Sequence, residues 1–268
     1  MNQRAPQPTP QPSEFLPGTV ALVGAGPGDP ELLTLKAVKA IAAATVLLVD
    51  DLVNDAVLMH ARPGARIVHV GKRGGCKSTP QAFIEKLMVM AAREGEVVVR
   101  LKGGDPFIFG RGGEEVEHLR AQGIPVQVVN GITAGLAAMT SLGAPLTHRD
   151  QAHGVVFVTG HAASADAGTD WQQLAATARD ARLTLVIYMG VRDANRIQQE
   201  LLAGLPADTP VAVIRNASLP DQRHAVTSLD RLHATLVAEQ LGSPSVIVVG
   251  DVVRGIAAVR QSGARRVA

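Results

Sequence analysis

The fold is first indicated by residues 19–30, which read TVALVGAGPGDP. Val20 to Val23 make a short apolar run typical of a buried strand, and the glycine-rich turn Gly24–Asp29 follows it directly. Pro30 suits the first turn of a helix, because the N–H that proline lacks would have no helical partner there. A helical pattern continues to Ala44, so the stretch predicts a strand, a tight turn and a helix.

The same alternation continues along the chain. Further strands are expected in the first half at Val46 to Val49, Ile67 to Val70, Val97 to Leu101 and Val126 to Val129. A helical pattern over Pro80 to Arg93 stops at Gly95. The second half predicts a helix from Leu229 to Gln240 and strands at Val155 to Thr159, Leu183 to Tyr188, Val211 to Ile214, Ala225 to Thr227 and Val246 to Val249. Strands that alternate with helices predict βαβ units and a mostly parallel sheet.

The composition supports an α/β fold. Hydrophobic residues make up 46% of the chain but aromatic residues only 3%, so the core must consist of Val, Leu, Ile and Ala, which suits strands covered by helices on both faces. The two series of strands predict two α/β domains, residues 18–130 and 131–255, with a junction at Asn130 to Thr133. Residues 1–17, with five prolines, are predicted to be a disordered tail, and residues 256–268 a basic tail.

Charge and cysteine content limit the partners. The net charge is +2, from 26 basic and 24 acidic residues, which argues against nucleic acid as a partner but allows a polyanionic small molecule. Cys76 is the single cysteine and looks incidental; a lone cysteine excludes an intrachain disulfide and fits a reducing, cytoplasmic location. We expect no signal peptide, no membrane span and, because the histidines lack ligand spacing, no metal site.

The first glycine turn resembles a dinucleotide-binding fingerprint, and Asp50 follows the second strand where such a fingerprint places an acidic residue. An NAD-dependent oxidoreductase is therefore one alternative. Asp29 argues against it, because its carboxylate would lie at the helix N-terminus where a pyrophosphate should bind. Pro27 removes a further N–H from the turn. A tight turn without a ligand is the other alternative.

The second glycine loop is less ordinary. Residues 102–115 read KGGDPFIFGRGGEE and leave the end of an expected strand, where ligands bind in open α/β sheets. Five glycines in eleven residues indicate unusual backbone angles or close approach of a ligand. The alternatives are a structural cap for the loop as a whole and, for Asp105, a turn residue that bonds its own backbone.

These loops belong to a set of segments that resemble the uroporphyrinogen-III C-methyltransferases of the tetrapyrrole methylase superfamily. The similarity runs from about Gly18 to Val253, and its segments are Val23–Pro30, Val70–Arg73, Leu101–Glu115, Gly131–Ala134, Pro145–Asp150, Tyr188–Gly190 and Ser243–Gly250. The loop Leu101–Glu115 and the Leu-Thr-His-Arg-Asp segment are the specific signals.

The resemblance implies a tetrapyrrole methylase fold, with two α/β domains and the active site in the cleft between them. It implies a homodimer that uses S-adenosyl-L-methionine, releases S-adenosyl-L-homocysteine and methylates uroporphyrinogen III at C2 and C7. The product, precorrin-2, feeds sirohaem and cobalamin biosynthesis. The oxidation and metal insertion that some relatives perform with an extra domain are not expected here.

Residue roles follow from the matching segments. The donor would be bound by Pro27, Gly103, Gly104, Asp105, Ile108, Thr133, Ala134, Met189 and Ala217. The positions assigned to catalysis are Asp50 and Lys72, as proton acceptor and donor, together with Arg111 and Glu114. Arg149 and His148 would contact the substrate. Many relatives have Tyr-Asp-Arg at residues 49–51 and Pro at residue 130, where this chain has Val-Asp-Asp and Asn.

The chemistry narrows some of these roles. Arginine can bind the eight substrate carboxylates bidentately, which suits Arg111 and Arg149. Arginine is an unsuitable base because its pKa exceeds about 12, so Asp50 or Glu114 is the expected base for the proton that leaves the macrocycle. Lys72 would donate a proton or pair with a propionate. A tetrapyrrole carrier without turnover and a methylase for another corrinoid precursor or for RNA are the remaining alternatives.

Overall fold

The computed structural model describes residues 14–71, 79–161 and 168–256. Most of the two expected tails, together with Lys72, Cys76 and residues 162–167, lie outside this part of the chain. Two compact units are present: the first unit is Met1–Ala25 with Leu33–Asn130, and the second unit is Gly26–Leu32 with Gly131–Ala268. The expected domain limits of 18–130 and 131–255 stay a prediction.

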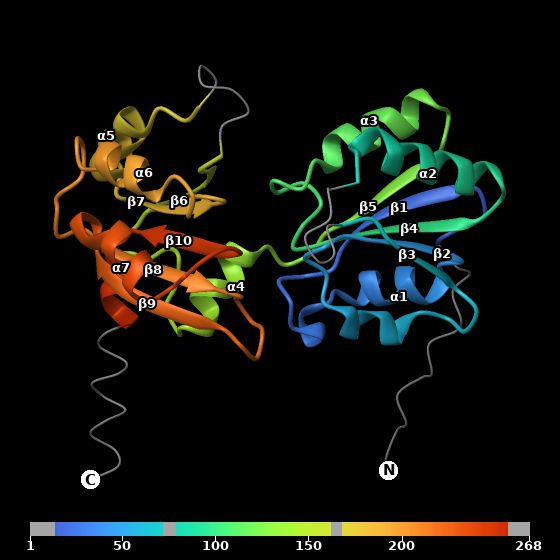
Figure 1. The fold of residues 1–268 in the computed structure, drawn as a ribbon, viewed down its shortest axis with the longest axis horizontal. Helices are drawn as coiled ribbons and strands as arrows, with labels where there is room; N and C mark the ends of the chain where they lie inside the picture. The colour runs from blue at the N-terminus through green and yellow to red at the C-terminus, as the bar shows by residue number, and fades with distance from the viewer. Residues whose placement is uncertain (1–13, 72–78, 162–167, 257–268) are drawn as a thin grey trace, which may run out of the picture. The chain divides into compact units, whose positions relative to one another are not determined.

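The first unit contains a five-stranded sheet in which every pair of neighbours is parallel, as predicted. Its order is β3-β2-β4-β1-β5, from β1 Thr19–Gly24, β2 Val46–Val49, β3 Arg66–His69, β4 Val97–Lys102 and β5 Val126–Val129. Helix α1 (Leu35–Ala43) lies on one face, and α2 (Gln81–Arg93) and α3 (Gly112–Ala121) lie on the other (Figure 1). All five strands confirm the predicted ranges closely.

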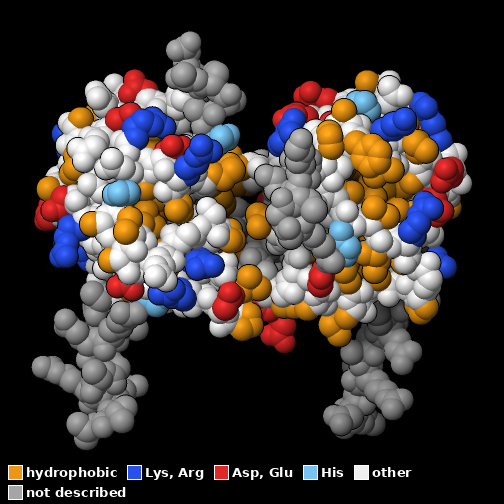
Figure 2. Space-filling view, in the orientation of Figure 1, with side chains coloured by type: hydrophobic (Ala, Val, Ile, Leu, Met, Phe, Trp, Pro, Cys, Tyr) orange, Lys and Arg blue, Asp and Glu red, His pale blue; other side chains and the backbone are white. Residues whose placement is uncertain are grey.

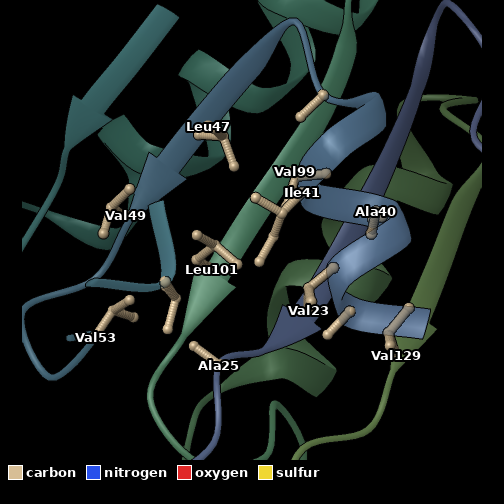
Figure 3. Close-up of a cluster of buried hydrophobic side chains, with 14 of the residues drawn as sticks. Val23, Ala25, Ala40, Ile41, Leu47, Val49, Val53, Val99, Leu101 and Val129 are labelled. Carbon is tan, nitrogen blue, oxygen red and sulfur yellow. The ribbon is translucent and has the colours of Figure 1, made fainter. Parts of the chain in front are cut away.

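The side chains of β4 point alternately to the two faces of the sheet, and each face packs against its own layer of helices. Val99 and Leu101 are fully buried among the side chains of α1, as Figure 3 shows, whereas Val98 packs on the opposite face with α2 and α3. Successive side chains of a strand point to opposite faces, and a sheet buried on both faces needs apolar residues at every position. Arg100 and Lys102 break this pattern on the face of α3.

The helix expected from Pro30 to Ala44 is interrupted, so that prediction was wrong in its extent. A 3-10 turn, η1 (Pro30–Leu32), is followed by α1, which begins only at Leu35. The hydroxyl of Thr34 accepts a hydrogen bond from the backbone N of Ala37 at 3.1 Å and thereby caps the new helix. The Asp29 carboxylate accepts one from the N–H of Glu31 at 2.9 Å, so it lies at the start of η1 as expected.

The second unit contains a sheet of order β6-β7-β10-β8-β9. Its strands are β6 Gly154–Thr159, β7 Leu183–Tyr188, β8 Pro210–Arg215, β9 Arg223–Ser228 and β10 Ser245–Val249. Only β6 and β7 are parallel, so the expectation of a mostly parallel sheet was wrong here. Strands β8 and β9 are joined by a short turn rather than by a helix, and short connections join antiparallel neighbours.

Helices cover both faces of this second sheet. Side chains of α5 (Trp171–Asp180), α6 (Ala194–Leu201) and α7 (Leu232–Ala238) form one core with it, and α4 (Ala134–Ser141) contributes to the other core together with the 3-10 turn η4 (Asp251–Val253). Trp171 is 1% exposed within the first of these cores and is therefore a packing residue. The helix expected from Leu229 begins with a 3-10 turn, η3 (Leu229–Arg231), before α7.

The surface agrees with the small net charge. On the face shown in Figure 2, acidic and basic side chains are interspersed on both units, and hydrophobic side chains gather over α2. Phe83 and Met90 of that helix are 51% and 47% exposed. Among the described residues, no helix has the length and apolar character needed to cross a lipid bilayer.

Candidate active site

The glycine loop that follows β4 holds an unusual backbone by means of its own side chains. Gly104 has a φ of +67°, a region that glycine adopts without strain. The buried Asp105 carboxylate accepts hydrogen bonds from the N–H of Phe107 at 2.8 Å and from Nδ2 of Asn130 at 3.2 Å. The turn role weighed for Asp105 is therefore present, and Asn130 supports it from the end of β5.

Apolar side chains of the same loop remain accessible. Phe107 and Phe109 are 53% and 39% exposed, and Ile108 between them is half-buried. Accessible apolar side chains next to a few polar groups are typical of ligand-binding sites. The loop thus offers backbone polar groups and an apolar surface together.

Arg111 and Glu114 form an ion pair at the start of α3. Nε of Arg111 lies 3.0 Å from Oε1 and 3.1 Å from Oε2 of Glu114, and its Nη2 also contacts Oε2. Both side chains are more than half exposed. The hydrogen bonds lower the pKa of Glu114 and raise that of Arg111. A carboxylate stabilised in its ionised form is a weaker base, so the ion pair with Arg111 makes Glu114 less suited to that role.

Asp50 follows β2 and lies beside the glycine loop's strand. Its backbone N–H donates to the carbonyl of Leu101 at 3.1 Å, as expected for neighbouring parallel strands. Its carboxylate accepts from Nη2 of Arg100 at 3.2 Å and from the N–H of Asp51 at 3.0 Å. The side chain is 35% exposed and lines a cavity of about 550 Å³. The cavity is lined by Val49, Asp50, Asp51, Val53, Asn54, Asp55, His69 and Gly71.

Behind Asp50 lies a buried cluster of charges that the sequence analysis did not identify. Arg100, Lys102 and Glu115 are 2%, 3% and 0% exposed. Glu115 pairs with Nε of Arg100 at 3.3 Å and with Nζ of Lys102 at 3.1 Å, and it accepts from Gln81 at 3.1 Å. Burial, and then the neighbouring Arg100 cation, lower the pKa of Lys102. The sequence does contain a signal for this cluster, because two cations stand at alternate positions of an otherwise apolar strand. Buried cations need an anionic partner, so the pattern predicts a buried carboxylate nearby.

In the second unit, three expected donor-binding residues come together around Tyr188. Thr133 is the N-cap of α4 and Ala134 its first residue, while Met189 directly follows Tyr188 at the end of β7. The Tyr188 hydroxyl lies 2.6 Å from Oγ1 of Thr133 and accepts from the N–H of Gly135 at 2.6 Å. Met189 is 48% exposed and has a φ of +54°. No sequence pattern pointed to this role of Tyr188.

The first glycine turn packs against a distant loop of the same unit. The N–H of Asp29 donates to Oγ of Ser218 at 3.0 Å, next to the buried Ala217. Gly28 has a φ of +145°, and a Cβ there would lie 2.7 Å from the Leu219 side chain. These contacts bring Pro27 and Ala217, both expected to bind the donor, into the same neighbourhood. The bond to Ser218 also occupies the N–H of Asp29, one of the groups on which a dinucleotide pyrophosphate would depend.

The substrate-binding candidates lie in an exposed turn. The N–H and carbonyl of His148 both bond to Ala152 at 2.9 Å, and its Nδ1 accepts from the N–H of Asp150 at 3.2 Å. His148 thus shapes the turn that presents Arg149, and both residues are exposed. Among the described residues, no group of histidine, cysteine and carboxylate side chains is arranged to hold a metal ion.

The expected site residues therefore fall into two sets. The first unit brings together Asp50, Arg111 and Glu114 with Gly103, Gly104, Asp105 and Ile108 at the carboxyl ends of β2 and β4. The second unit holds Pro27, Thr133, Ala134, Met189 and Ala217, with Arg149 and His148 in their separate turn. Lys72 follows the cavity residue Gly71 but lies outside the described residues.

Comparisons with known proteins agree on one family. The model of the tetrapyrrole (corrin/porphyrin) methylases matches residues 19–233. The chain is 54% identical to the uroporphyrinogen-III C-methyltransferase of Pseudomonas aeruginosa, over 89% of this chain and 96% of that protein. It is 50% identical to siroheme synthase 2 of Aeromonas salmonicida, over 88% of this chain and 48% of that longer protein.

Solved structures give the same result for the fold. The uroporphyrin-III C-methyltransferase of Thermus thermophilus, complexed with S-adenosyl homocysteine, is 42% identical, with a TM-score of 0.73 over 88% of this chain and 93% of that one. The predicted fold of two α/β parts is confirmed by this likeness and by the two sheets described above. Since the family model spans both units and relatives of more than 40% identity match nearly their whole length, the chain belongs to the tetrapyrrole methylase family.

Proposed function

We propose that the protein is a uroporphyrinogen-III C-methyltransferase that methylates C2 and C7 of its substrate and releases precorrin-2 for sirohaem and cobalamin biosynthesis. The observation that carries this proposal is the family match over residues 19–233, and within it the Asp50 side chain lines a cavity at the end of β2, next to the strand that leads into the glycine loop. Relatives that carry this activity in their names match nearly the whole chain.

The residues present fit S-adenosyl-L-methionine, which supplies an electrophilic methyl group on a cationic sulfur. The half-buried backbone at Gly103 and Gly104 would offer carbonyl oxygens to a cation, and the half-buried Ile108 would offer apolar contact for an adenosyl group. In the second unit, the exposed Met189 would offer apolar contact as well. Orientation of the reactants lowers the barrier by roughly 7 to 11 kcal/mol in well-aligned systems.

The chain's own side chains would handle the charges and the proton. Arg149 and Arg111 suit the substrate carboxylates, and Arg111 would exchange part of its pairing with Glu114 for them. Asp50, which faces the cavity, would accept the proton that leaves the macrocycle after methylation. His148 would hold the turn that presents Arg149, and Lys72 would pair with a propionate or donate a proton.

The proposal includes a homodimer in the cytoplasm. The hydrophobic side chains that gather over α2, among them Phe83 and Met90, form a surface that a second copy would cover (Figure 2). The single cysteine suits a reducing compartment. Light scattering after size-exclusion chromatography should give twice the mass of the chain.

The test is an absorbance assay with uroporphyrinogen III and S-adenosyl-L-methionine, followed by mass spectrometry of the product. We expect two added methyl groups per macrocycle. A single or misplaced methylation, or transfer only to another corrinoid precursor, would refute the proposal. Calorimetry separates the oxidoreductase alternative: S-adenosyl-L-homocysteine should bind and NAD should not.

A further inference from the structure

Arg100 occupies an unusual position for a charged residue. It lies on β4, the central strand of the first unit's sheet, and is 2% exposed. Its Nη1 donates to the carbonyls of Leu48 at 3.4 Å and Leu101 at 3.1 Å, its Nε to Glu115 at 3.3 Å, and its Nη2 to Asp50 at 3.2 Å. Every nitrogen of the guanidinium group therefore has a fixed partner.

Packing alone does not account for this arrangement. Val98, two residues earlier on the same face of β4, is fully buried among apolar side chains. Removing charges from water costs several kcal/mol per ion, and apolar replacement of a whole buried cluster is often neutral or stabilising. Arg100 and Lys102 are matched by Glu115 and Asp50, so the cluster is neutral overall. A neutral but costly cluster suggests a purpose beyond stability.

The partial exposure of Asp50 indicates that purpose. Arg100 holds one carboxylate oxygen of Asp50 from the interior, and the Asp51 N–H holds the other, while the same side chain lines the 550 Å³ cavity. The carboxylate thus has a fixed orientation toward the cavity. Glu115, on α3 at the far end of the glycine loop, fixes Arg100 in turn and is itself held by Gln81 and Lys102.

We propose that Arg100, fixed by Glu115, is a positioning residue that orients Asp50 for proton transfer. This inference rests on the proposed function, in which Asp50 is the base. A base that is misaligned by removal of such a support loses turnover rather than substrate affinity, because the defect appears only in the transition state. The cluster also links the orientation of Asp50 to α3, whose N-cap is Arg111 and whose first turn contains Glu114.

The kinetic test uses Arg100→Met, Arg100→Lys and Glu115→Gln, with Arg196→Met as the matched control on an exposed surface of the second unit. We expect Arg100→Met to lower kcat about 30-fold with less than a threefold change in KM, which lies within the range that misplacement of a catalytic group produces. Arg100→Lys should recover part of the loss, and Glu115→Gln should reduce kcat as well. Arg196→Met should match the wild type.

A double variant separates positioning from general loss of structure. If Arg100 acts through Asp50, Asp50→Asn combined with Arg100→Met should be no slower than Asp50→Asn alone. Multiplicative losses in the double variant, or an unchanged kcat in Arg100→Met and Glu115→Gln, would overturn the inference. Normal binding of S-adenosyl-L-homocysteine by Arg100→Lys would show that the variant is folded.

Failure of the proposed function would be distinguishable. Carbon-13 labelling of aspartate gives a carboxyl resonance for Asp50, which is identified by its loss in Asp50→Asn. That resonance should move in Arg100→Lys and Glu115→Gln but not in Arg196→Met. If the wild type does not methylate uroporphyrinogen III, the proposed function is wrong; an unmoved resonance refutes the positioning of Asp50 independently.

Discussion

The hydroxyl of Tyr188, at the end of β7, lies 2.6 Å from the hydroxyl of Thr133, which precedes α4 by one residue. The same oxygen accepts the N–H of Gly135, one of the N–H groups in the first turn of α4 that lack a helical partner. One side chain therefore fixes the start of α4 to the strand that leads into Met189.

Tyr188→Phe should weaken donor binding. The substitution keeps the ring, which packs edge-on against Phe157, but leaves a buried N–H without its acceptor, at a cost of about 1 to 3 kcal/mol. We expect the affinity for S-adenosyl-L-homocysteine, measured by calorimetry, to fall about tenfold. Leu136→Ala, a change at an exposed side chain on α4, is the control and should bind nearly as the wild type does. Unchanged affinity in Tyr188→Phe would show that Thr133 and Met189 do not need this support.

Stability at alkaline pH should also depend on Tyr188. Burial raises the pKa of its hydroxyl above the ordinary value of 10.0. As the pH rises through 10, the unfolded chain loses this proton before the folded chain does, so the free energy of unfolding falls between pH 10 and the raised folded pKa. We expect urea titrations over that range to show a smaller decline for Tyr188→Phe. An identical decline of the unfolding free energy in both proteins would contradict a raised pKa of the Tyr188 hydroxyl.

The two carboxylates considered as the base should respond differently to neutralisation. Asp50→Asn should lower kcat by about 100-fold or more, the usual contribution of a general base. Glu114→Gln should have a clearly smaller effect on kcat and should act mainly on KM, because its loss releases Arg111 for substrate carboxylates. Steady-state kinetics with S-adenosyl-L-homocysteine binding as a folding control decides between them. The reverse ranking would assign the base to Glu114.

Asn130 should matter for the glycine loop. Its amide donates to the carboxylate of Asp105 at 3.2 Å, so Asn130→Ala removes one of the contacts that hold the loop. A lost hydrogen bond of this kind typically costs about 1 kcal/mol, or about fivefold in an equilibrium constant. We expect donor affinity to fall by that factor with little change in melting temperature. Gln127→Ala, at the neighbouring strand β5, provides a control.

The core between α1 and the first sheet should carry much of that unit's stability. Ile41 is fully buried there (Figure 3), and Ile41→Ala should cost about 2 to 5 kcal/mol of unfolding free energy, through lost burial and the cavity that remains. Leu35→Ala on the same helix, at an 83% exposed side chain, should cost less than about 1 kcal/mol. If chemical denaturation gave equal losses of unfolding free energy for Ile41→Ala and Leu35→Ala, the burial pattern of α1 would be contradicted.

Local patterns were sufficient for the parts of the fold that depend on neighbours in the chain. Apolar runs such as Val46 to Val49 predicted the strands, because a strand buried on both faces is apolar on both. The extent of helices was less predictable. The pattern from Pro30 to Ala44 is continuous, yet the Thr34 side chain caps a separate helix, and such a choice depends on packing as well as on propensity.

The sequence by itself determined the α/β class, the two glycine turns at strand ends and, through its segments, the family, because these depend on residue types at short spacing. Only the tertiary structure decided that β8, β9 and β10 run antiparallel, that Arg100 lies between Asp50 and Glu115, and that Tyr188 meets Thr133. The side-chain partners in these two clusters lie 15 to 55 residues apart in the sequence. Contacts across such separations depend on strand order and register. Order and register are set by the burial of apolar faces and the pairing of buried charges in the folded chain, so local periodicity does not predict them.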